Sequence, residues 1–327
     1  MNSILVTGAA GFIGYQTVRK LLAEGHSVIG IDDLNDHYDV RLKQYRLDDL
    51  LKTDGFSFSH CSITDRNALS AVFDDYSIGG IINLAARPGV RYSIENPQVY
   101  IDTNVSGTLN LLHCCAEHGI PKLVLASTSS LYAGQKMPFT EDLPVNEPVS
   151  PYAASKKAAE ALAYTYHHLY GLDITVLRYF TVYGPAGRPD MSYFRFIRWI
   201  DEGSEILVYG DGSQKRDFTY VEDIAEGTVR ALEVKNGYEI INLGGNKTHE
   251  LNELVGLIET YCGKKARRKE LPFHRADMTA TWADITKAGR ILGWKPRVSL
   301  TEGIKRTVEW YYANKSWAAD IDLDLSK

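Results

Sequence analysis

The sequence predicts an α/β protein built on a doubly wound, parallel sheet, with a smaller α/β lobe interleaved toward the C-terminus. Short apolar runs alternate with helical patterns over the first 180 residues. The runs are apolar throughout, as is typical of strands that helices cover on both faces. The first run ends in a glycine-rich turn that opens a helix, and the second ends in an acidic pair. Right-handed crossovers between such strands give a doubly wound fold.

Each element of the first half has a sequence pattern of its own. Residues Phe12–Ala23 place Ile13 and Leu21 on one helical face, and Gly25 follows as a residue that ends helices. The predicted strands are Ile4–Val6, Val28–Ile31, Ile81–Ala85, Leu123–Ala126 and Ile174–Leu177. The further predicted helices of this half are 97–118 and 152–170. Helices therefore separate the strands, as parallel pairing requires.

The alternation weakens after residue 180, where Tyr183–Pro189 is rich in glycine and proline and indicates a loop. The elements expected beyond it are a helix at Tyr193–Glu202, strand-like or helical pieces at Val221–Leu232 and Leu251–Tyr261, and a last helix at 301–313. The predicted units are a sheet domain of residues 1–180 to which 215–245 returns, a lobe of 181–214 and 246–315, and a polar tail of 316–327. We expect that tail to be loosely ordered.

Composition excludes several classes of protein. The 327 residues carry 36 basic and 41 acidic side chains, a net charge of −5, with 44% hydrophobic residues. This balance disfavours intrinsic disorder, and the mild acidity gives no reason to expect nucleic acid as a partner. The first apolar run is too short for a membrane span, so no membrane partner is expected. The four cysteines lack metal-ligand spacing, which predicts no metal site and a reducing, cytoplasmic location.

A glycine-rich turn after the first strand indicates a dinucleotide site. Gly8, Gly11 and Gly14 form the pattern GxxGxxG, with Phe12 and Ile13 inside it. Glycines let backbone N–H groups approach a pyrophosphate at the helix N-terminus. The alternative is a glycine turn that serves only helix–strand packing.

An acid after the second strand indicates which dinucleotide binds. Asp32 lies where a carboxylate accepts from both ribose hydroxyls, which favours NAD over NADP. Ser62 and Ile63, after the third strand, are candidates for contact with the adenine.

Tyr152 and Lys156 are the candidate base and its partner. They stand four residues apart at the start of a predicted helix, so they share one helical face. A free tyrosine has a pKa of about 10, too high for a base at neutral pH. The ammonium of Lys156 and the positive charge of NAD would favour the phenolate and lower that pKa. Lys156 is also a candidate ligand of the nicotinamide ribose. The alternative is a packed tyrosine beside an exposed lysine.

A hydroxyl cluster follows a neighbouring strand. Residues Ser127–Ser130 come directly after Leu123–Ala126, at the strand end where doubly wound sheets bind ligands. A hydroxyl there can relay a proton and orient a substrate alcohol toward Tyr152. The alternative is a polar turn in which the hydroxyls cap the backbone.

Taken together, these motifs resemble the extended short-chain dehydrogenase/reductases over nearly the whole chain. Within them the sequence is similar to the NAD-dependent nucleotide-sugar epimerases, and most like the UDP-glucuronate 4-epimerases. The segments that carry this resemblance are Asn83–Ala86, Asn104 with Gly107, Arg178–Phe180, Arg216–Val221, Asp33–Val40, Gly89–Pro97 and Phe180–Met191. The departures from the family pattern are Asn83 in place of histidine, Ser62 in place of an acid and Ala186 in place of an aromatic residue.

The resemblance assigns roles to further residues. It implies that Leu84, Ala85, Ala86 and Asn104 contact NAD and that Arg216 neutralises the diphosphate of the substrate. Further candidates on the nucleotide side are Arg91, His274, Arg275, Asp277 and the run Leu207–Tyr209, which we expect to line the uracil. Related proteins are homodimers through the helices near 97–118 and 152–170, so a homodimer is expected.

The resemblance also separates neighbouring reactions. Dehydratases of this kind place Asp and Glu after the threonine, where this chain has Ser129 and Ser130. Dehydration is therefore disfavoured, and decarboxylating relatives carry a glutamate that is also absent. The predicted reaction is a transient oxidation at C4, with Tyr152 as base and Thr128 on the C4 oxygen. NAD should stay tightly bound, because each turnover regenerates it.

A glucuronate substrate sets one more requirement. The 4-ketone next to the C5 carboxylate is a β-keto acid, which loses carbon dioxide when its carboxyl bond aligns with the ketone. Arg188 is the candidate clamp, because guanidinium binds carboxylate bidentately, with Thr181, Ser129 and Ser130 completing the site. The alternative for Arg188 is a phosphate contact or a solvated loop charge. The alternative functions are a UDP-glucose/UDP-galactose 4-epimerase, a UDP-glucuronate decarboxylase and a non-catalytic NAD-binding protein.

Overall fold

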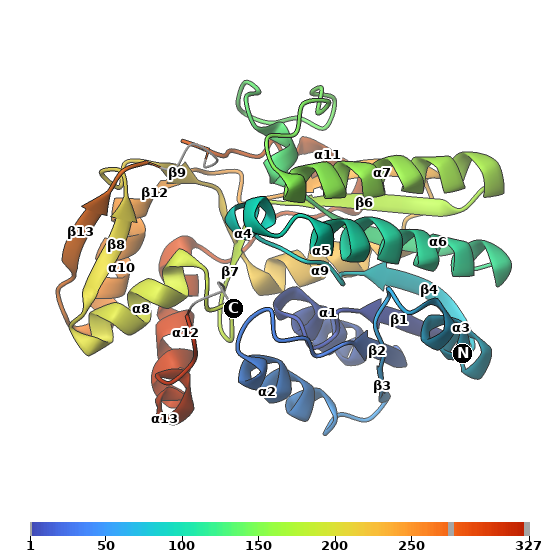
Figure 1. The fold of residues 1–327 in the computed structure, drawn as a ribbon, viewed down its shortest axis with the longest axis horizontal. Coiled ribbons are helices and arrows are strands. Elements are labelled where there is room, and N and C mark those ends of the chain that lie inside the picture. Colours follow the sequence, from blue (N-terminus) through green and yellow to red (C-terminus); the bar gives the residue numbers. More distant parts are fainter. Residues whose placement is uncertain (1, 274–277, 324–327) are drawn as a thin grey trace.

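A seven-stranded sheet forms the centre of the molecule in the computed structural model, which describes residues 2–273 and 278–323 (Figure 1). Its strands, in spatial order, are β11 (Tyr238–Leu243), β6 (Asp173–Tyr179), β5 (Lys122–Thr128), β4 (Ile78–Asn83), β1 (Ser3–Thr7), β2 (Val28–Asp32) and β3 (Phe56–His60). Every pair is parallel, and the winding reverses between β1 and β4. The predicted doubly wound sheet is thus confirmed.

Helices cover both faces of this sheet (Figure 1). One layer contains α1 (Phe12–Ala23), α9 (Val221–Glu233) and α11 (Thr286–Leu292), and the other contains α3 (Arg66–Asp75), α6 (Thr108–Glu117) and α7 (Pro151–Tyr170). Within β1, Ile4 and Val6 pack into the first layer whereas Leu5 packs into the second. Alternate side chains of a strand point to opposite faces, so strands covered twice must be apolar at every position.

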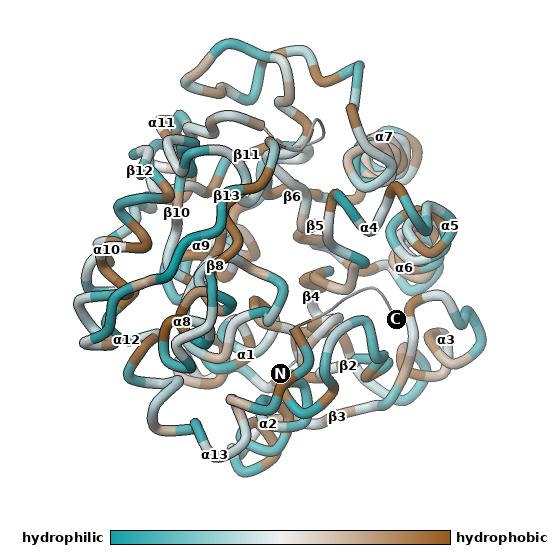
Figure 2. Tube along the Cα trace, turned by 60° about the vertical axis from the view of Figure 1, so that its left-hand side comes forward, coloured by the Kyte–Doolittle hydropathy of each residue, from teal (hydrophilic) through white to brown (hydrophobic). Residues whose placement is uncertain are grey.

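A second hydrophobic core lies in the C-terminal lobe, on the left of Figure 1. Its elements are α8 (Ser192–Glu202), β8 (Glu205–Tyr209), α10 (Leu251–Cys262), β13 (Arg267–Leu271), α12 (Leu300–Ala313) and α13 (Lys315–Ala318). The strands β8 and β13 pair in parallel. Figure 2 shows β13 as a hydrophilic stretch, and its first four residues are exposed.

The segment that we expected to be a loose tail instead packs on this lobe as far as the structure describes it. Ala318 and Ile321 are buried in the core of the lobe. Arg195 donates a hydrogen bond to the Leu323 carbonyl at 2.6 Å, and Arg198 donates to the Ile321 carbonyl. The apolar residues within the polar tail sequence therefore hold residues 316–323 in place, whereas 324–327 lie outside the described residues.

Short strands connect the two units. Strand β7 (Thr181–Tyr183) pairs with β10 (Phe218–Tyr220), and β9 (Lys215–Arg216) pairs with β12 (His249–Glu250). The chain thus returns from the lobe through β10 and α9 to the edge strand β11 of the sheet. Helices that the sequence patterns had not indicated include α2 (Val40–Leu50), α3, α4 (Val90–Glu95), α11, α13 and a 3₁₀ turn at Ser129–Tyr132. In the described part of the chain, every helix is too short or too polar to cross a bilayer.

The predicted helix over 97–118 is interrupted. It consists of α5 (Gln98–Tyr100), a π-helical turn at Ile101–Gly107, and α6. Asn104 lies in the π turn, is 1% exposed, and donates hydrogen bonds to the Arg87 carbonyl at 3.1 Å and to Ser155 Oγ at 2.9 Å. It also accepts from the Arg87 amide at 2.8 Å. The wider turn brings this side chain to the loop after β4, a placement that π-bulges often provide near functional sites.

A buried ion pair joins α7 to the sheet. The Arg178 guanidinium of β6 binds both carboxylate oxygens of Glu160 at 2.8 and 2.9 Å, and the two residues are 1% and 2% exposed. Ser127 Oγ donates to the same carboxylate at 2.6 Å, and Arg178 also donates to the Tyr132 hydroxyl at 2.8 Å. This network fixes α7 against the ends of β5 and β6 and satisfies two charges that would be costly to bury alone.

Replacement of one partner should destabilise the protein strongly. We expect Glu160→Leu to lower the free energy of unfolding by about 3–5 kcal/mol, because Arg178 then stays buried without a counter-charge. Urea denaturation measures the change. The matched control is Glu202→Gln in the more exposed Arg198–Glu202 pair of α8, for which about 0–1 kcal/mol is expected. Additive losses in the double variant Glu160→Leu/Arg178→Leu would contradict this view of the pair.

Candidate active site

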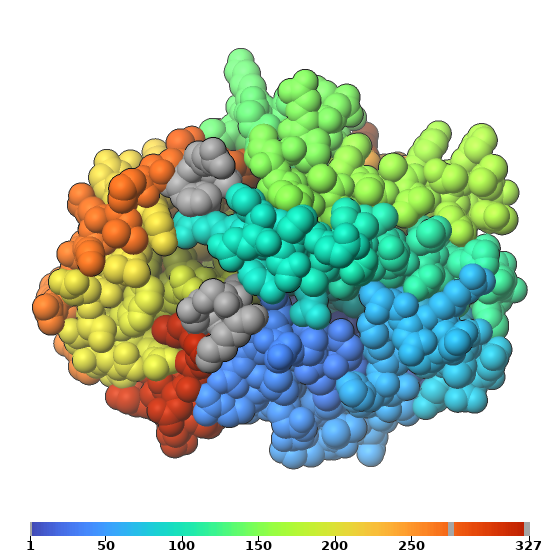
Figure 3. All heavy atoms as spheres, viewed as in Figure 1, coloured from blue at the N-terminus to red at the C-terminus, as the bar shows by residue number. Residues whose placement is uncertain are grey.

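A cavity of about 710 Å³ lies at the carboxyl ends of the sheet strands. Residues from the ends of β1, β2, β4, β5 and β6 line it on one side, and residues of β7, α8 and β8 line it on the other. Figure 3 shows the surface hollowed between the α4 segment and the α8–β8 segment. The cavity therefore lies where ligands bind in doubly wound sheets, between the two hydrophobic cores.

One end of the cavity is the glycine turn before α1. Gly8 has φ 67°, and a Cβ on it would lie 2.8 Å from the Ala85 nitrogen. A Cβ at Gly14 would lie 2.0 Å from the Gly8 carbonyl oxygen. The glycines are therefore necessary for packing, and they also bring backbone N–H groups to the cavity. The N-cap residue Gly11 has no side-chain cap, and the first turn of α1 holds no acid. This helix end thus suits an anion.

Asp32 ends β2 beside this turn and is 6% exposed. Its two carboxylate oxygens accept from the Ala10 amide at 3.1 Å and from the Leu34 amide at 2.9 Å. The ammonium of Lys43 lies 3.5 Å from the same carboxylate. Each carboxylate oxygen can accept a second hydrogen bond, so Asp32 retains capacity for ligand hydroxyls. These contacts fix its position at the cavity wall.

All the predicted cofactor residues except Asn104 line the cavity. Those that line the cavity are Gly8, Gly11, Phe12, Ile13, Gly14, Asp32, Ser62, Ile63, Leu84, Ala85, Ala86, Tyr152 and Lys156. Asn104, predicted by family resemblance, is absent from the described lining residues. Its amide is committed to the backbone of Arg87 and to Ser155 behind the cavity wall. Its contacts hold the backbone of Arg87 in the loop after β4, and the contact of Asn104 with NAD stays a prediction.

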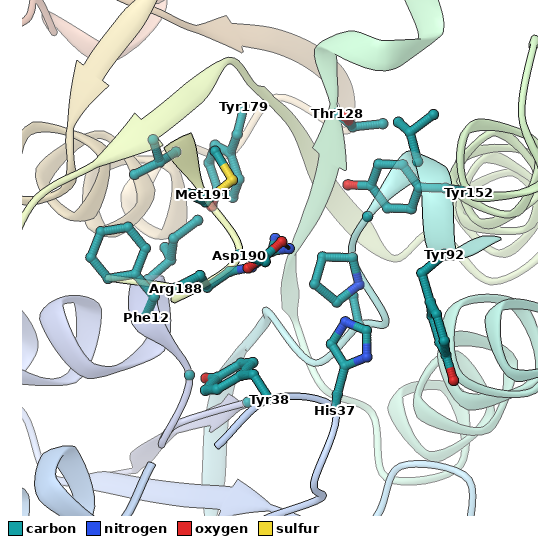
Figure 4. Close-up of a pocket in the computed structure, with 18 of the residues that line it drawn as sticks. Phe12, His37, Tyr38, Tyr92, Thr128, Tyr152, Tyr179, Arg188, Asp190 and Met191 are labelled. Atoms are coloured by element: carbon teal, nitrogen blue, oxygen red, sulfur yellow. Dashed lines mark hydrogen bonds and ion pairs between the residues drawn. The ribbon is translucent and has the colours of Figure 1, made fainter. Parts of the chain in front are cut away.

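Thr128, Tyr152 and Lys156 all line the cavity, and Figure 4 shows Thr128 beside Tyr152. Thr128 ends β5, and the other two share one face of α7. Ser150 caps this helix by accepting from the Ala153 amide at 3.2 Å, and Pro151 occupies its first turn. Lys156 Nζ donates to the Ala126 carbonyl at 3.0 Å. The structure thus brings together the three residues that the sequence selected.

Burial controls the acidity of this group. It raises the pKa of the Tyr152 phenol, whereas the Thr128 hydrogen bond and the positive charge of Arg188 lower it. Burial also lowers the pKa of Lys156 to about 8, against the opposing charge of Glu160. The predicted lowering of the Tyr152 pKa relied partly on the charge of NAD, and within the chain alone burial outweighs the neighbouring charges.

Arg188 faces Tyr152 from the loop between β7 and α8. In Figure 4 the guanidinium meets Asp190 near the centre of the cavity, and the Tyr152 hydroxyl points into the same space. Arg188 Nε donates to Asp190 Oδ1 at 3.0 Å, and Nη2 donates to Oδ2 at 2.5 Å. Burial lowers the pKa of Arg188, but the charge and hydrogen bonds of Asp190 act against it, and the net pKa lies above the usual value. The cation that the sequence selected as a clamp therefore already holds one internal carboxylate.

Arg46 of α2 holds the loop that carries Arg188. It is fully buried and donates to the Ala186 carbonyl at 2.6 and 3.1 Å and to the Ala10 carbonyl at 3.0 Å. It also donates to the Tyr38 hydroxyl at 2.8 Å. Ala186 has φ 52°, which is strained for a residue with a side chain and persists only where its surroundings hold it. One side chain thus ties the loop of Arg188 to the glycine turn.

The remaining substrate-side predictions mostly lie at the cavity. Its lining includes Ser129, Ser130, Thr181, Arg91 and Arg216. Thr128 Oγ1 donates to Ser130 Oγ at 3.1 Å, so the hydroxyl cluster is linked. The guanidinium of Arg91 in α4 lies 3.9 Å from the ring centre of Tyr209 in β8 and bridges the sheet domain and the lobe. Asp277, with His274 and Arg275, lies outside the described residues.

Several residues of the site escaped the sequence analysis. Arg46 and Lys43 lie on α2, which no motif indicated, and their burial cannot be read from a polar helix pattern. His37 lines the cavity, and its buried Nε2 has no hydrogen-bond partner among the described residues. Burial, followed by the charge of Arg188, lowers its pKa to about 4, so it is neutral at pH 7. His37 and Asp190 stood within family segments but had no assigned role.

Comparisons with known proteins agree with this geometry. The sequence profile of the NAD dependent epimerase/dehydratase family matches residues 4–244. The UDP-glucuronate 4-epimerase of Thermodesulfobacterium geofontis is 58% identical over 315 residues, which cover 96% of this chain and 97% of that protein. The crystal structure of a Bacillus cereus UDP-glucuronic acid 4-epimerase in complex with UDP-glucuronic acid and NAD matches with a TM-score of 0.90 and 37% identity, covering 95% of this chain and 99% of that one.

A structure with a neutral sugar nucleotide is also similar. The UDP-glucose 4-epimerase of Thermotoga maritima, solved with UDP-glucose, matches with a TM-score of 0.88 and 32% identity. The match covers 96% of this chain and 99% of that one. Fold similarity thus spans acidic and neutral sugars, and residues of the cavity must distinguish between them.

Arg46 should control the mobility of the loop that carries Arg188. We expect Arg46→Met to accelerate amide hydrogen exchange within residues 184–191 by about tenfold or more, since two backbone carbonyls lose a buried donor. Exchange followed by mass spectrometry measures the effect. Arg46→Lys is the matched control, because it retains the charge but not the planar set of donors, and should give an intermediate rate. An unchanged rate in Arg46→Met would show that the loop is held by other contacts.

Proposed function

Because the chain belongs to the NAD dependent epimerase/dehydratase family, we propose that it is a UDP-glucuronate 4-epimerase. It inverts C4 of UDP-glucuronate to give UDP-galacturonate, with tightly held NAD as cofactor. The observation that carries this proposal is the placement of Arg188. Its cation lines the same cavity as the candidate base Tyr152 and is close enough to lower the pKa of that phenol. A cation at this place suits a sugar whose C5 bears a carboxylate.

The cavity has the donors and acceptors that NAD requires. The unprotected N-terminus of α1 suits the pyrophosphate, and Asp32 presents acceptors for the hydroxyls of the adenosine ribose. Ser62, Ile63 and Lys156 also line the cavity. The first two are the proposed contacts of the adenine, and Lys156 serves the nicotinamide ribose. When bound, NAD supplies the acceptor of the C4 hydride and then its donor.

Tyr152 removes the proton of the C4 hydroxyl and returns it after the ketone has turned in the site. Thr128 holds the C4 oxygen and shares a hydrogen bond with Tyr152, which makes the phenolate more accessible. Lys156 remains protonated below a pKa of about 8 and stabilises that phenolate. The Ala126 carbonyl fixes its ammonium, so the charge stays beside the base.

Arg188, with Ser129, Ser130 and Thr181, holds the sugar carboxylate during the ketone stage. Oxidation at C4 makes a β-keto acid, and a carboxylate kept out of alignment with the ketone does not leave as carbon dioxide. A guanidinium gives two parallel hydrogen bonds and therefore fixes the plane of the carboxylate as well as its position.

Arg216, Arg91, Leu207 and Tyr209 line the cavity. In this proposal the two arginines serve the diphosphate and the sugar, Leu207 and Tyr209 contact the uracil, and Asp277 is a further nucleotide ligand. The same arrangement disfavours the neutral sugar of a UDP-glucose 4-epimerase, for which a cation beside C5 has no partner.

We further propose a cytoplasmic homodimer. The cysteines Cys61, Cys114, Cys115 and Cys262 are free thiols, which supports a reducing compartment. Large apolar side chains are exposed on the two helical segments predicted to pair, and they are Ile101, Leu109, Tyr164, Leu169 and Tyr170. These segments lie side by side on the outside of the sheet in Figures 1 and 2. Exposed apolar side chains on neighbouring outer helices favour an interface.

Incubation of the purified protein with UDP-glucuronate, without added NAD, tests the function. NMR of the product should show UDP-galacturonate, because the cofactor is regenerated within the site. Tyr152→Phe should retain NAD but lose turnover by about 10²–10⁴-fold, since the base is removed. UDP-xylose or UDP-arabinose as the main product would indicate decarboxylation, whereas unchanged turnover in Tyr152→Phe would exclude the proposed base.

Size-exclusion chromatography with light scattering tests the dimer. We expect a mass of twice the 36.6 kDa chain. Leu109→Asp should shift the mass toward that of the monomer, since a charge replaces an exposed apolar contact on α6. Val149→Asp, an equally apolar exposed position outside both segments, is the control and should leave the mass unchanged. A monomeric wild-type protein would contradict the proposal.

A further inference from the structure

The Arg188–Asp190 pair leaves two guanidinium donors on one edge without an acceptor among the described residues. We propose that Asp190 is a positioning residue, which holds one edge of the Arg188 guanidinium and leaves the other edge for the carboxylate of the substrate. This inference rests on the proposed function, because it takes the sugar carboxylate as the second ligand. Asp190 binds Nε and Nη2, at 3.0 and 2.5 Å. Among the described residues, none accepts a hydrogen bond from Nη1.

The chemistry of guanidinium permits this division. Its five N–H groups lie in one plane and form two edges, each able to bind a carboxylate bidentately. Asp190 uses the Nε–Nη2 edge, and the Nη1–Nη2 edge keeps its donors. An arginine held in this way already points its free edge in one direction, so the orientation of the bound carboxylate is set before the substrate arrives. Asp190 also balances the charge of Arg188 before the substrate arrives.

The loop holds the pair rigidly enough for this role. The side chains of Arg188 and Asp190 are 20% and 12% exposed. The Met191 amide donates to the Arg188 carbonyl at 3.3 Å, which closes a turn around the pair. At Gly187, a Cβ would lie 2.1 Å from the Tyr193 hydroxyl, so the backbone there is packed against α8. Together with the Arg46 contacts to Ala186, these restraints fix the direction in which the free edge points.

The orientation of the Arg188 guanidinium affects whether the 4-keto intermediate loses carbon dioxide. In decarboxylation the C5–C6 bond breaks, its electron pair moves into the C4 carbonyl to form an enolate, carbon dioxide leaves, and C5 then takes up a proton. The two electrons removed at C4 stay with the cofactor, so the sugar product is a UDP-4-ketopentose unless hydride returns to it. This step requires the C5–C6 bond to align with the carbonyl π-system. A guanidinium held by Asp190 fixes the carboxylate plane and disfavours that alignment.

Asp190 also carries a negative charge close to the substrate carboxylate. Two carboxylates on one guanidinium repel each other, so Asp190 weakens the binding of the acidic sugar while it improves its orientation. A substitution that removes the charge should therefore affect affinity and product ratio in opposite directions. Damage to the fold would instead weaken substrate binding. Tighter binding together with a larger share of decarboxylated product is therefore specific to a positioning role.

The test compares Asp190→Asn with the wild-type enzyme on UDP-glucuronate. Carbon dioxide and UDP-galacturonate are measured in the same reaction, and their ratio does not depend on how much protein is folded. We expect this ratio to rise about tenfold or more, since a misplaced reacting group readily changes a rate by that amount. We also expect KM to fall by about threefold, because repulsion between two carboxylates is removed. Glu202→Gln in α8 removes the same charge outside the cavity and should change neither quantity.

The outcomes distinguish this inference from the proposed function. Absence of UDP-galacturonate with the wild-type enzyme would overturn the proposed function itself. If the wild type turns over, an unchanged product ratio in Asp190→Asn, or a raised KM, would overturn the positioning role alone. Asp190→Ala is the second variant should Asp190→Asn not fold, and loss of the fold in both variants would assign Asp190 a structural role instead.

Discussion

The buried ion pair between Glu160 and Arg178 is the interaction on which the site depends. It ties α7, which carries Tyr152 and Lys156, to strands β5 and β6. Glu160 follows Lys156 by one helical turn and accepts from Ser127, the neighbour of Thr128. The base, its lysine and its threonine are thus held by one carboxylate that itself stays out of the cavity. A buried charge of this kind is costly unless fully paired, which explains why its partners come from two elements.

The cations in the cavity wall and behind it are paired on the same principle. Arg46 donates hydrogen bonds to backbone carbonyls. Lys43 forms an ion pair with Asp32, and Arg188 forms one with Asp190. The net charge of −5 therefore says little about the ligand, because anionic ligands meet local donors and not the average charge of the chain. A pocket whose cations already have partners can bind and release an acidic sugar nucleotide without leaving a bare charge behind.

Much of this arrangement was predictable from the sequence. Continuous apolar strands and the GxxGxxG turn indicated the sheet, since burial on both faces and a close helix start leave clear patterns. The placement of Thr128 followed from its position at the end of a strand, and the pairing of Tyr152 with Lys156 followed from their spacing on one helical face. The π turn at Asn104 and the packed tail residues Ala318 and Ile321 were not predictable, because tertiary contacts decide them. The pairing of Asp190 with Arg188 depends on the geometry of a turn, which the helix and strand patterns of a sequence do not predict.

The central claim is that one hydride leaves C4 of the sugar and returns to the opposite face within the same site. UDP-glucuronate deuterated at C4 tests this claim most directly, with the purified protein and no added NAD. We expect UDP-galacturonate that retains the deuterium at C4, as measured by NMR and mass spectrometry. Loss of the deuterium to water would contradict it, because it would show that C4 is inverted by proton removal from carbon.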